Sequence, residues 1–143
     1  MKPLLLLLLS MSLMSCAQKT DVRPEQGMIG YWYGESEKDG RKQKWFIHRS
    51  DYGTFSIHFK FYSKDFLVKW YKEYGTWRIT NGIYSTATTK LEDENGFFYP
   101  DSPDKIYHGQ YQLLELTKDV FRYKEIKSNE IYQVKRVQQD FEF

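Results

Sequence analysis

One cysteine and three histidines are the side chains of this chain best suited to nucleophilic or metal chemistry. The histidines, His48, His58 and His108, are not spaced so that two of them ligate one metal from the same strand or helix face. His48 and His58 could face each other across a turn at 51–53, or both could lie exposed on that hairpin. The spacing of the histidines therefore predicts no metal site. Cys16 is the only thiol in 143 residues, and a lone cysteine excludes a disulfide scaffold.

Sequence motifs for catalysis are absent as well. The chain has no Gly-x-Ser-x-Gly nucleophile motif and no glycine-rich phosphate loop. The acidic run 92–95 lacks the Gly and Glu positions of a calcium-binding loop, so it predicts a solvated turn. We expect no catalytic residue, no enzyme activity and no cofactor. The 21 Lys and Arg are interleaved with 19 Asp and Glu, which gives no basic footprint for nucleic acid.

The segment before Cys16 explains why a single thiol is present. Lys2 is followed by the unbroken apolar run Leu4–Leu9, which is too short to cross a bilayer and predicts a signal peptide over residues 1–15. The sequence Leu13-Met14-Ser15-Cys16 resembles the lipobox of bacterial lipoproteins. That resemblance implies cleavage before Cys16 and acylation of the cysteine. The alternative is an ordinary secretory signal, which leaves a free thiol in an oxidising compartment.

Lipidation at Cys16 implies a lipid bilayer as the partner of this chain. Ala17, in place of Asp, resembles the pattern that directs Gram-negative lipoproteins to the outer membrane. We therefore expect a protein of the bacterial cell envelope, at the outer membrane, on its periplasmic side or on the cell surface. Residues 16–28 have almost nothing to bury and predict a lipidated cysteine with a flexible tether. The folded domain is expected over 29–143.

The domain has the composition and periodicity of a β-sheet. Four Trp, twelve Tyr and ten Phe accompany only five Leu beyond Ser15, and aromatic residues favour strands over helices. The clearest strand runs from Thr54 to Phe61, with every second residue apolar. Similar runs lie at 29–36, 43–49, 66–72, 74–80, 83–90, 106–117, 119–126 and 130–137. Turns are expected at Asp39-Gly40 and Asn81-Gly82.

These runs predict an all-β fold with eight or nine antiparallel strands in a single up-and-down barrel. A β-sandwich is the alternative. Gly30-Tyr31-Trp32 resembles the Gly-x-Trp signature of lipocalins, and Tyr74-Gly75-Thr76-Trp77 resembles small lipocalin-like bacterial domains. The lipocalin resemblance implies that Trp32 closes one end of the barrel beneath a basic residue of the last strand. Arg136 is the candidate for that residue.

The interior of such a barrel either packs solid or holds one small ligand. We expect its lining to be aromatic, which suits a small apolar molecule. Small side chains at 85, 87 and 89 would leave room if Ser85, Ala87 and Thr89 point inward. The aromatic residues predicted to bind the ligand are Phe55, Phe59, Trp70, Trp77, Tyr111 and Phe121.

Two further segments, 91–105 and the last four residues, are expected to contact the barrel. Residues 91–105 form the longest stretch without a strand pattern, and this loop either forms a lid over the barrel or covers one end of its core. The ending Asp140-Phe141-Glu142-Phe143 is expected to pack against the barrel. The sequence thus predicts a membrane-anchored lipoprotein whose barrel binds a small apolar ligand. The alternative is a structural or protein-interaction lipoprotein with a solid core.

Overall fold

Nine β-strands and one short helix make up residues 23–100 and 108–143, the part of the chain that this computed structural model describes. The helix and strands follow in the order α1 (Pro24–Met28), β1 (Gly30–Lys38), β2 (Arg41–Arg49), β3 (Thr54–Ser63), β4 (Phe66–Thr80), β5 (Ile83–Asp93), β6 (Gly96–Phe98), β7 (His108–Leu116), β8 (Val120–Glu125) and β9 (Ile131–Val137).

The strands close into a barrel. Neighbours pair antiparallel in the order β4-β3-β2-β1-β9-β8-β7-β5-β6, and a further pairing between β4 and β5 completes the ring. Eight strands form the barrel, and β6 is an extra strand on the edge of β5. The predicted all-β, up-and-down antiparallel barrel is confirmed, and the β-sandwich is excluded. Closure leaves no unpaired edge around the barrel itself.

Tight turns join the first strands where the sequence predicts them. Asp39 and Gly40 have φ of 53° and 71°, and Asn81 and Gly82 have φ of 52° and 75°. Two consecutive positive φ values are what a two-residue type I′ hairpin requires, and Asn, Asp and Gly adopt them at the lowest cost. These turns set the registers of β1 with β2 and of β4 with β5.

Two predicted boundaries differ from the structure. The runs 66–72 and 74–80 belong to one strand, β4, because Gly75 does not end the strand but sits at a bulge opposite β5. The stretch 91–105 begins as a hairpin, in which β5 continues to Asp93 and pairs with β6. Residues 101–105 of this stretch, on which the predicted lid partly falls, lie outside the described residues.

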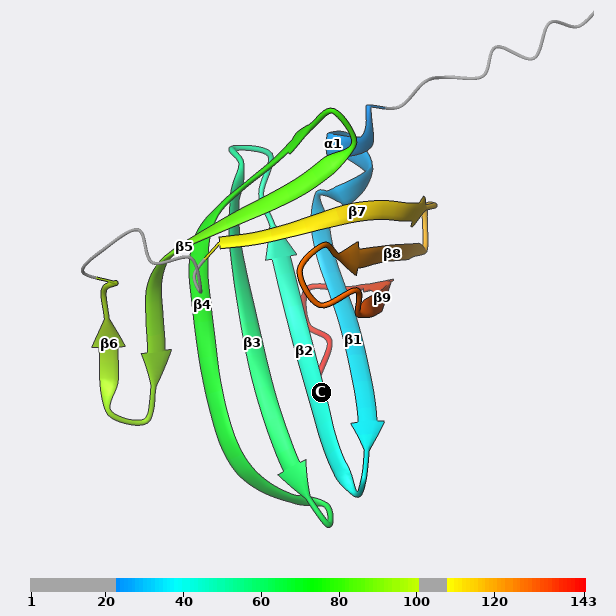
Figure 1. Cartoon of the computed structure of the whole chain (residues 1–143). Helices are drawn as coiled ribbons and strands as arrows, with labels where there is room; N and C mark the ends of the chain where they lie inside the picture. The colour runs from blue at the N-terminus through cyan, green and yellow to red at the C-terminus, as the bar shows by residue number, and fades with distance from the viewer. Residues whose placement is uncertain (1–22, 101–107) are drawn as a thin grey trace, which may run out of the picture.

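The two ends of the barrel differ. Figure 1 shows α1 at the end where β1 begins, while the hairpins joining β1 to β2 and β3 to β4 extend from the opposite end. Met28 of α1 is buried, and its carbonyl oxygen accepts a hydrogen bond from Trp32 Nε1 at 2.9 Å. The last residues of the expected tether, 24–28, therefore form part of the folded domain. Within the described residues no helix is long and apolar enough to cross a membrane.

The core fills the α1 end of the barrel. Its buried members come from α1 and from seven of the strands, and they are Met28, Trp32, Trp45, Ile47, Phe55, Trp77, Tyr84, Phe121, Tyr123 and Val134. Alternation along each strand turns these residues inward. The aromatic excess of the sequence thus packs largely against itself, which leaves less free interior than an open-ended barrel would have.

Residues after β9 cover part of the outer surface. The ring of Phe141 lies 4.9 Å from that of Tyr33, and the ring of Phe143 stacks 5.6 Å from that of Phe46. Lys60 Nζ donates a hydrogen bond to the main-chain oxygen of Phe143 at 2.7 Å. The prediction that this segment packs on the barrel is confirmed.

Candidate functional site

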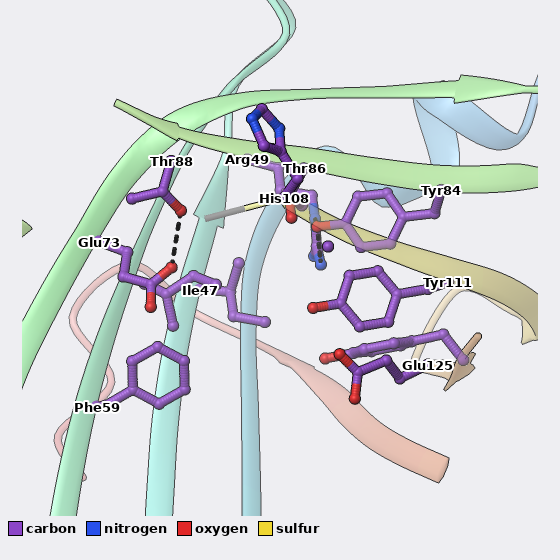
Figure 2. Close-up of a pocket in the computed structure, with 13 residues that line it drawn as sticks. Ile47, Arg49, Phe59, Glu73, Tyr84, Thr86, Thr88, His108, Tyr111 and Glu125 are labelled. Carbon is purple, nitrogen blue, oxygen red and sulfur yellow. Dashed lines mark hydrogen bonds between the residues drawn. The ribbon is translucent and has the colours of Figure 1, made fainter. Parts of the chain in front are cut away.

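A cavity of about 150 Å³ lies inside the barrel, next to the core. Its walls come from six strands, β2, β3, β4, β5, β7 and β8 (Figure 2). The lining residues are Ile47, Arg49, Ile57, Phe59, Glu73, Tyr84, Thr86, Thr88, His108, Gly109, Tyr111, Tyr123 and Glu125. The lining combines apolar walls with several polar groups, which is the usual make-up of a small-molecule site.

Arg49 is the most deeply buried charge of the cavity, with 1% of its surface exposed. As the last residue of β2 it continues the inward series of Trp45 and Ile47. Its Nε and Nη2 both donate hydrogen bonds to the Tyr84 hydroxyl, at 3.1 and 3.0 Å. The rings of Tyr84 and Phe121 also lie 4.9 and 5.3 Å from the guanidinium carbon. These contacts hold the guanidinium in one orientation.

One nitrogen of that guanidinium has no hydrogen-bond partner. Arg49 Nη1 is buried and unpaired among the described residues. Neither does Arg49 form an ion pair with any described carboxylate. A buried donor without a partner is uncommon in native proteins, and it calls for an explanation in terms of water, an ion or a ligand.

Glu73 of β4 is a second charged residue of the lining, and it is half-buried. Thr88 Oγ1 donates a hydrogen bond to its Oε2 at 3.0 Å (Figure 2). Burial raises the pKa of the Glu73 carboxyl, and the hydrogen bond from Thr88 partly offsets this increase. Because burial disfavours the charged form, Glu73 takes up a proton more readily than an exposed glutamate. It does not neutralise Arg49, since no ion pair joins the two residues.

Tyrosines form one wall of the cavity, and apolar side chains together with Glu73 form the other. Tyr84 stacks on Tyr111 at 5.4 Å, and Tyr111 meets Tyr123 edge to face at 5.2 Å. Burial raises the pKa of Tyr111 and Tyr123, so their hydroxyls stay protonated. Figure 2 shows Ile47 and Phe59 on the side of Glu73, opposite these rings. A molecule in the cavity would meet an apolar surface on one side and hydroxyl groups on the other.

The cavity adjoins a groove of about 820 Å³. Both are lined by Thr86, His108, Gly109 and Glu125. The groove also includes Lys127, from the hairpin between β8 and β9. These shared residues mark the side from which a small molecule would reach the interior.

Some of the aromatic residues predicted to bind a ligand line this cavity. Phe59 and Tyr111 are in its walls. Phe55, Trp77 and Phe121 are instead buried in the core beside it. The aromatic interior is thus divided between a packed core and the cavity lining. Residue type alone does not distinguish a core aromatic residue from one that lines the cavity.

Trp70 lies on the outer face of the barrel. Tyr71 and Glu73 occupy inward positions of β4, so alternation turns Trp70 and Lys72 outward. The ring of Trp70 meets His58 edge to face at 5.8 Å, and Lys72 Nζ lies 5.5 Å from it. Trp70 therefore takes no part in the cavity.

The inward positions of β5 also differ from the expectation. Tyr84, Thr86 and Thr88 face the cavity, whereas Ser85 and Ala87 line the neighbouring groove. The condition that Ser85, Ala87 and Thr89 point inward is not met, because alternation defines two faces without saying which one is inside. The cavity wall consequently includes the hydroxyls of Thr86 and Thr88 beside that of Tyr84.

Sequence analysis did not identify Arg49, Glu73 or Tyr84. A signal was present, because Arg49 and Glu73 each occupy an inward position of a strand whose other inward residues are mostly apolar. A charged residue in such a series either breaks the strand or serves the interior. Tyr84 carries no comparable signal, since it resembles any other core aromatic residue.

The closed end has the arrangement that the Gly-x-Trp resemblance implies. The Arg136 guanidinium carbon lies 4.2 Å from the centre of the buried Trp32 ring. Its Nη1 and Nη2 donate hydrogen bonds to the carbonyl oxygens of Ile29 and Gly27. A Cβ at Gly30 would lie 2.8 Å from Arg136 Nη1, and the φ of Gly30 is +113°. Glycine is required here for both reasons.

The predictions for the N-terminal segment and for metal binding remain. Cys16 and the predicted signal peptide 1–15 lie outside the described residues. Among the described residues, no three His, Cys, Asp or Glu side chains gather as metal ligands would. No family model matches the chain, and a search of curated proteins finds no match either.

Proposed function

We propose that this protein is a lipid-anchored, lipocalin-like barrel that binds a small molecule in its interior and catalyses no reaction. The observation that carries the proposal is the cavity of about 150 Å³ between Arg49, Glu73 and the tyrosine wall. A cavity of about this size accommodates a molecule as large as benzene. The ligand is therefore small, and its apolar part contacts Ile47, Ile57 and Phe59.

The membrane anchor in this proposal is acylated Cys16. Each buried CH₂ of an acyl chain contributes about 0.8 kcal/mol, so more than one chain anchors a protein stably. α1 and the closed end of the barrel follow directly after the tether in sequence. The barrel is thereby displayed at the bacterial outer membrane.

The ligand-binding role is tested with benzene and phenol as probes of the cavity. Either probe should raise the melting temperature, because a ligand that binds only the folded state stabilises it. Thr86→Leu is the matched variant, since Leu adds volume to the cavity wall, and its melting temperature should not respond. If neither probe stabilises the wild type, the cavity is not a binding site and this function is wrong.

An interaction protein is the second candidate, and exposed apolar side chains favour it. Phe66, Leu67 and Val68, at the start of β4, are 76%, 49% and 63% exposed. Apolar surface of this kind often marks a contact with a partner. A photo-crosslinking residue at position 66 should then give a defined product in intact envelopes. The same residue at Tyr52, an exposed aromatic on the β2–β3 turn, is the control and should give none.

A further inference from the structure

We infer that the ligand of the cavity is a small monocarboxylate whose carboxylate binds Arg49 Nη1. The inference rests on the proposed function, namely that the barrel interior binds a small molecule, and it names the chemical class of that molecule. Arg49 is the starting point because it is the most deeply buried charged group in the described residues.

The charge of Arg49 has no counterpart in the protein. No described carboxylate lies within 4.0 Å of it, and the Tyr84 hydroxyl that accepts from Nε and Nη2 is neutral. A buried guanidinium without a counter-ion attracts an anion strongly, since little water screens the interaction. The missing negative charge is therefore supplied by the ligand.

The geometry of the guanidinium is set before a ligand arrives. Tyr84 binds two of its three nitrogens, and the rings of Tyr84 and Phe121 lie 4.9 and 5.3 Å from its carbon. The third nitrogen, Nη1, is buried without a hydrogen-bond partner among the described residues, and Arg49 lines the cavity. A donor held in advance loses little conformational freedom on binding, which increases affinity. Figure 2 also shows the Tyr111 hydroxyl pointing toward the middle of the cavity, where it can donate a second hydrogen bond.

The two glutamates of the lining do not oppose this assignment. Burial raises the pKa of Glu73, and a protonated carboxyl can donate a hydrogen bond to a carboxylate. Glu125 accepts a hydrogen bond from Ser128 Oγ in the β8–β9 hairpin, which holds its carboxylate toward the surface. His108, the histidine of the wall, is exposed.

The size of the cavity and its donor set restrict the anion. One guanidinium nitrogen and neutral hydroxyls suit a single negative charge, whereas a phosphate dianion requires further cationic donors. The apolar wall of Ile47, Ile57 and Phe59 favours a short hydrocarbon group on the same molecule. A cavity of about 150 Å³ has room for about six heavy atoms, as in benzene.

Isobutyrate and isobutyramide test the inference, because they have the same shape and differ in charge. Isothermal titration of the wild type should give at least tenfold tighter binding for isobutyrate. Arg49→Met should remove this preference while benzene and phenol still stabilise the variant. Equal affinities for the two probes in the wild type, or an unchanged preference in Arg49→Met, would overturn the inference and leave the proposed function standing. Failure of every probe would instead overturn the proposed function.

A measurement on the wild type keeps the test valid if Arg49→Met does not fold. Isobutyrate, but not isobutyramide, should shift the ¹⁵Nη resonances of the buried Arg49 guanidinium. Methyl phosphate is the control anion and should shift them at least tenfold less at the same concentration. Shifts of equal size with isobutyramide would mean that Nη1 does not recognise charge, and equal shifts with methyl phosphate would contradict the carboxylate assignment.

Discussion

The guanidinium of Arg136, in the last strand, covers the ring of Trp32, in the first strand, at 4.2 Å. Trp32 is completely buried, and Arg136 also donates hydrogen bonds to the carbonyl oxygens of Gly27, Ile29 and Lys118. One side chain therefore joins α1, the start of β1, the β7–β8 turn and β9. The two ends of the folded chain are held together at the closed end of the barrel.

Replacing Arg136 by Lys should destabilise the protein by about 2–4 kcal/mol, because an ammonium cannot make three hydrogen bonds in this fork geometry. Urea denaturation measures the loss. Arg122→Lys is the control, since the partly exposed Arg122 makes a surface ion pair with Glu115 at 3.6 Å. Its effect should stay below about 0.5 kcal/mol. Equal effects of the two substitutions would contradict the role of Arg136.

Gly75→Ala should destabilise the protein by at least about 2 kcal/mol, or prevent folding, because overpacking forces the backbone apart. A Cβ at Gly75 would lie 2.0 Å from the carbonyl oxygen of Ala87 and 2.8 Å from the ring of Phe55. Thr76→Ala, at the exposed neighbouring position, is the matched control. Thermal unfolding of both variants decides the matter, and a Gly75→Ala protein as stable as the wild type would show that the bulge tolerates a side chain.

The stability of the protein should fall as the pH decreases from 6.5 to 4, in part because of His58. Burial, together with Lys60 and Lys72, lowers the pKa of His58 to about 4, although Glu92 acts in the opposite direction. The unfolded chain binds a proton near pH 6.5 and the folded chain only near pH 4, so acid favours unfolding in this interval. NMR titration of the His58 ring measures the pKa directly.

The variant His58→Gln should lose less stability between pH 6.5 and 4 than the wild type. Its unfolding free energy is compared with that of the wild type at half-unit steps of pH. Parallel curves over the interval would mean that His58 has an ordinary pKa in the folded protein.

Removing the ring of Phe143 should cost about 1–2 kcal/mol and expose the outer aromatic surface of β2 and β3. The ring stacks on Phe46 and lies 5.1 Å from His58. Phe143→Ala should also raise the pKa of His58, since part of its burial is lost. The adjacent exposed Glu142 offers a control, because Glu142→Ala should change neither stability nor the His58 titration.

Cys16→Ser should release the protein from the envelope membranes, because acylation requires the thiol. Expression in a Gram-negative host, membrane fractionation and labelling with a palmitate analogue measure this. The wild type should sediment with outer membranes and carry the label, and the variant should do neither. A wild type without label would refute the lipid anchor while leaving the barrel and its cavity unaffected.

Several parts of the fold follow from local pattern. Alternation along residues 54–61 predicts β3, and Asn81-Gly82 predicts the hairpin after β4. Continuity across Gly75 and the short strand β6 were missed. A glycine ends the strand in many proteins. Gly75 does not, because β5 and Phe55 pack close to it. A three-residue strand such as β6 has too few residues for a periodic signal.

The sequence by itself determined the all-β class and the hairpin turns, because alternation and turn residues are local. The resemblance of Gly30-Tyr31-Trp32 to the Gly-x-Trp signature indicated the closed end at Trp32 and Arg136. Only the tertiary structure decided which face of β4 and β5 lies inside. That choice put Trp70 on the outer surface and placed Glu73 and Thr88 in the cavity. It also paired Arg49 with Tyr84, 35 positions apart in the chain. Contacts between strands so distant arise from closure of the barrel, which no local period encodes.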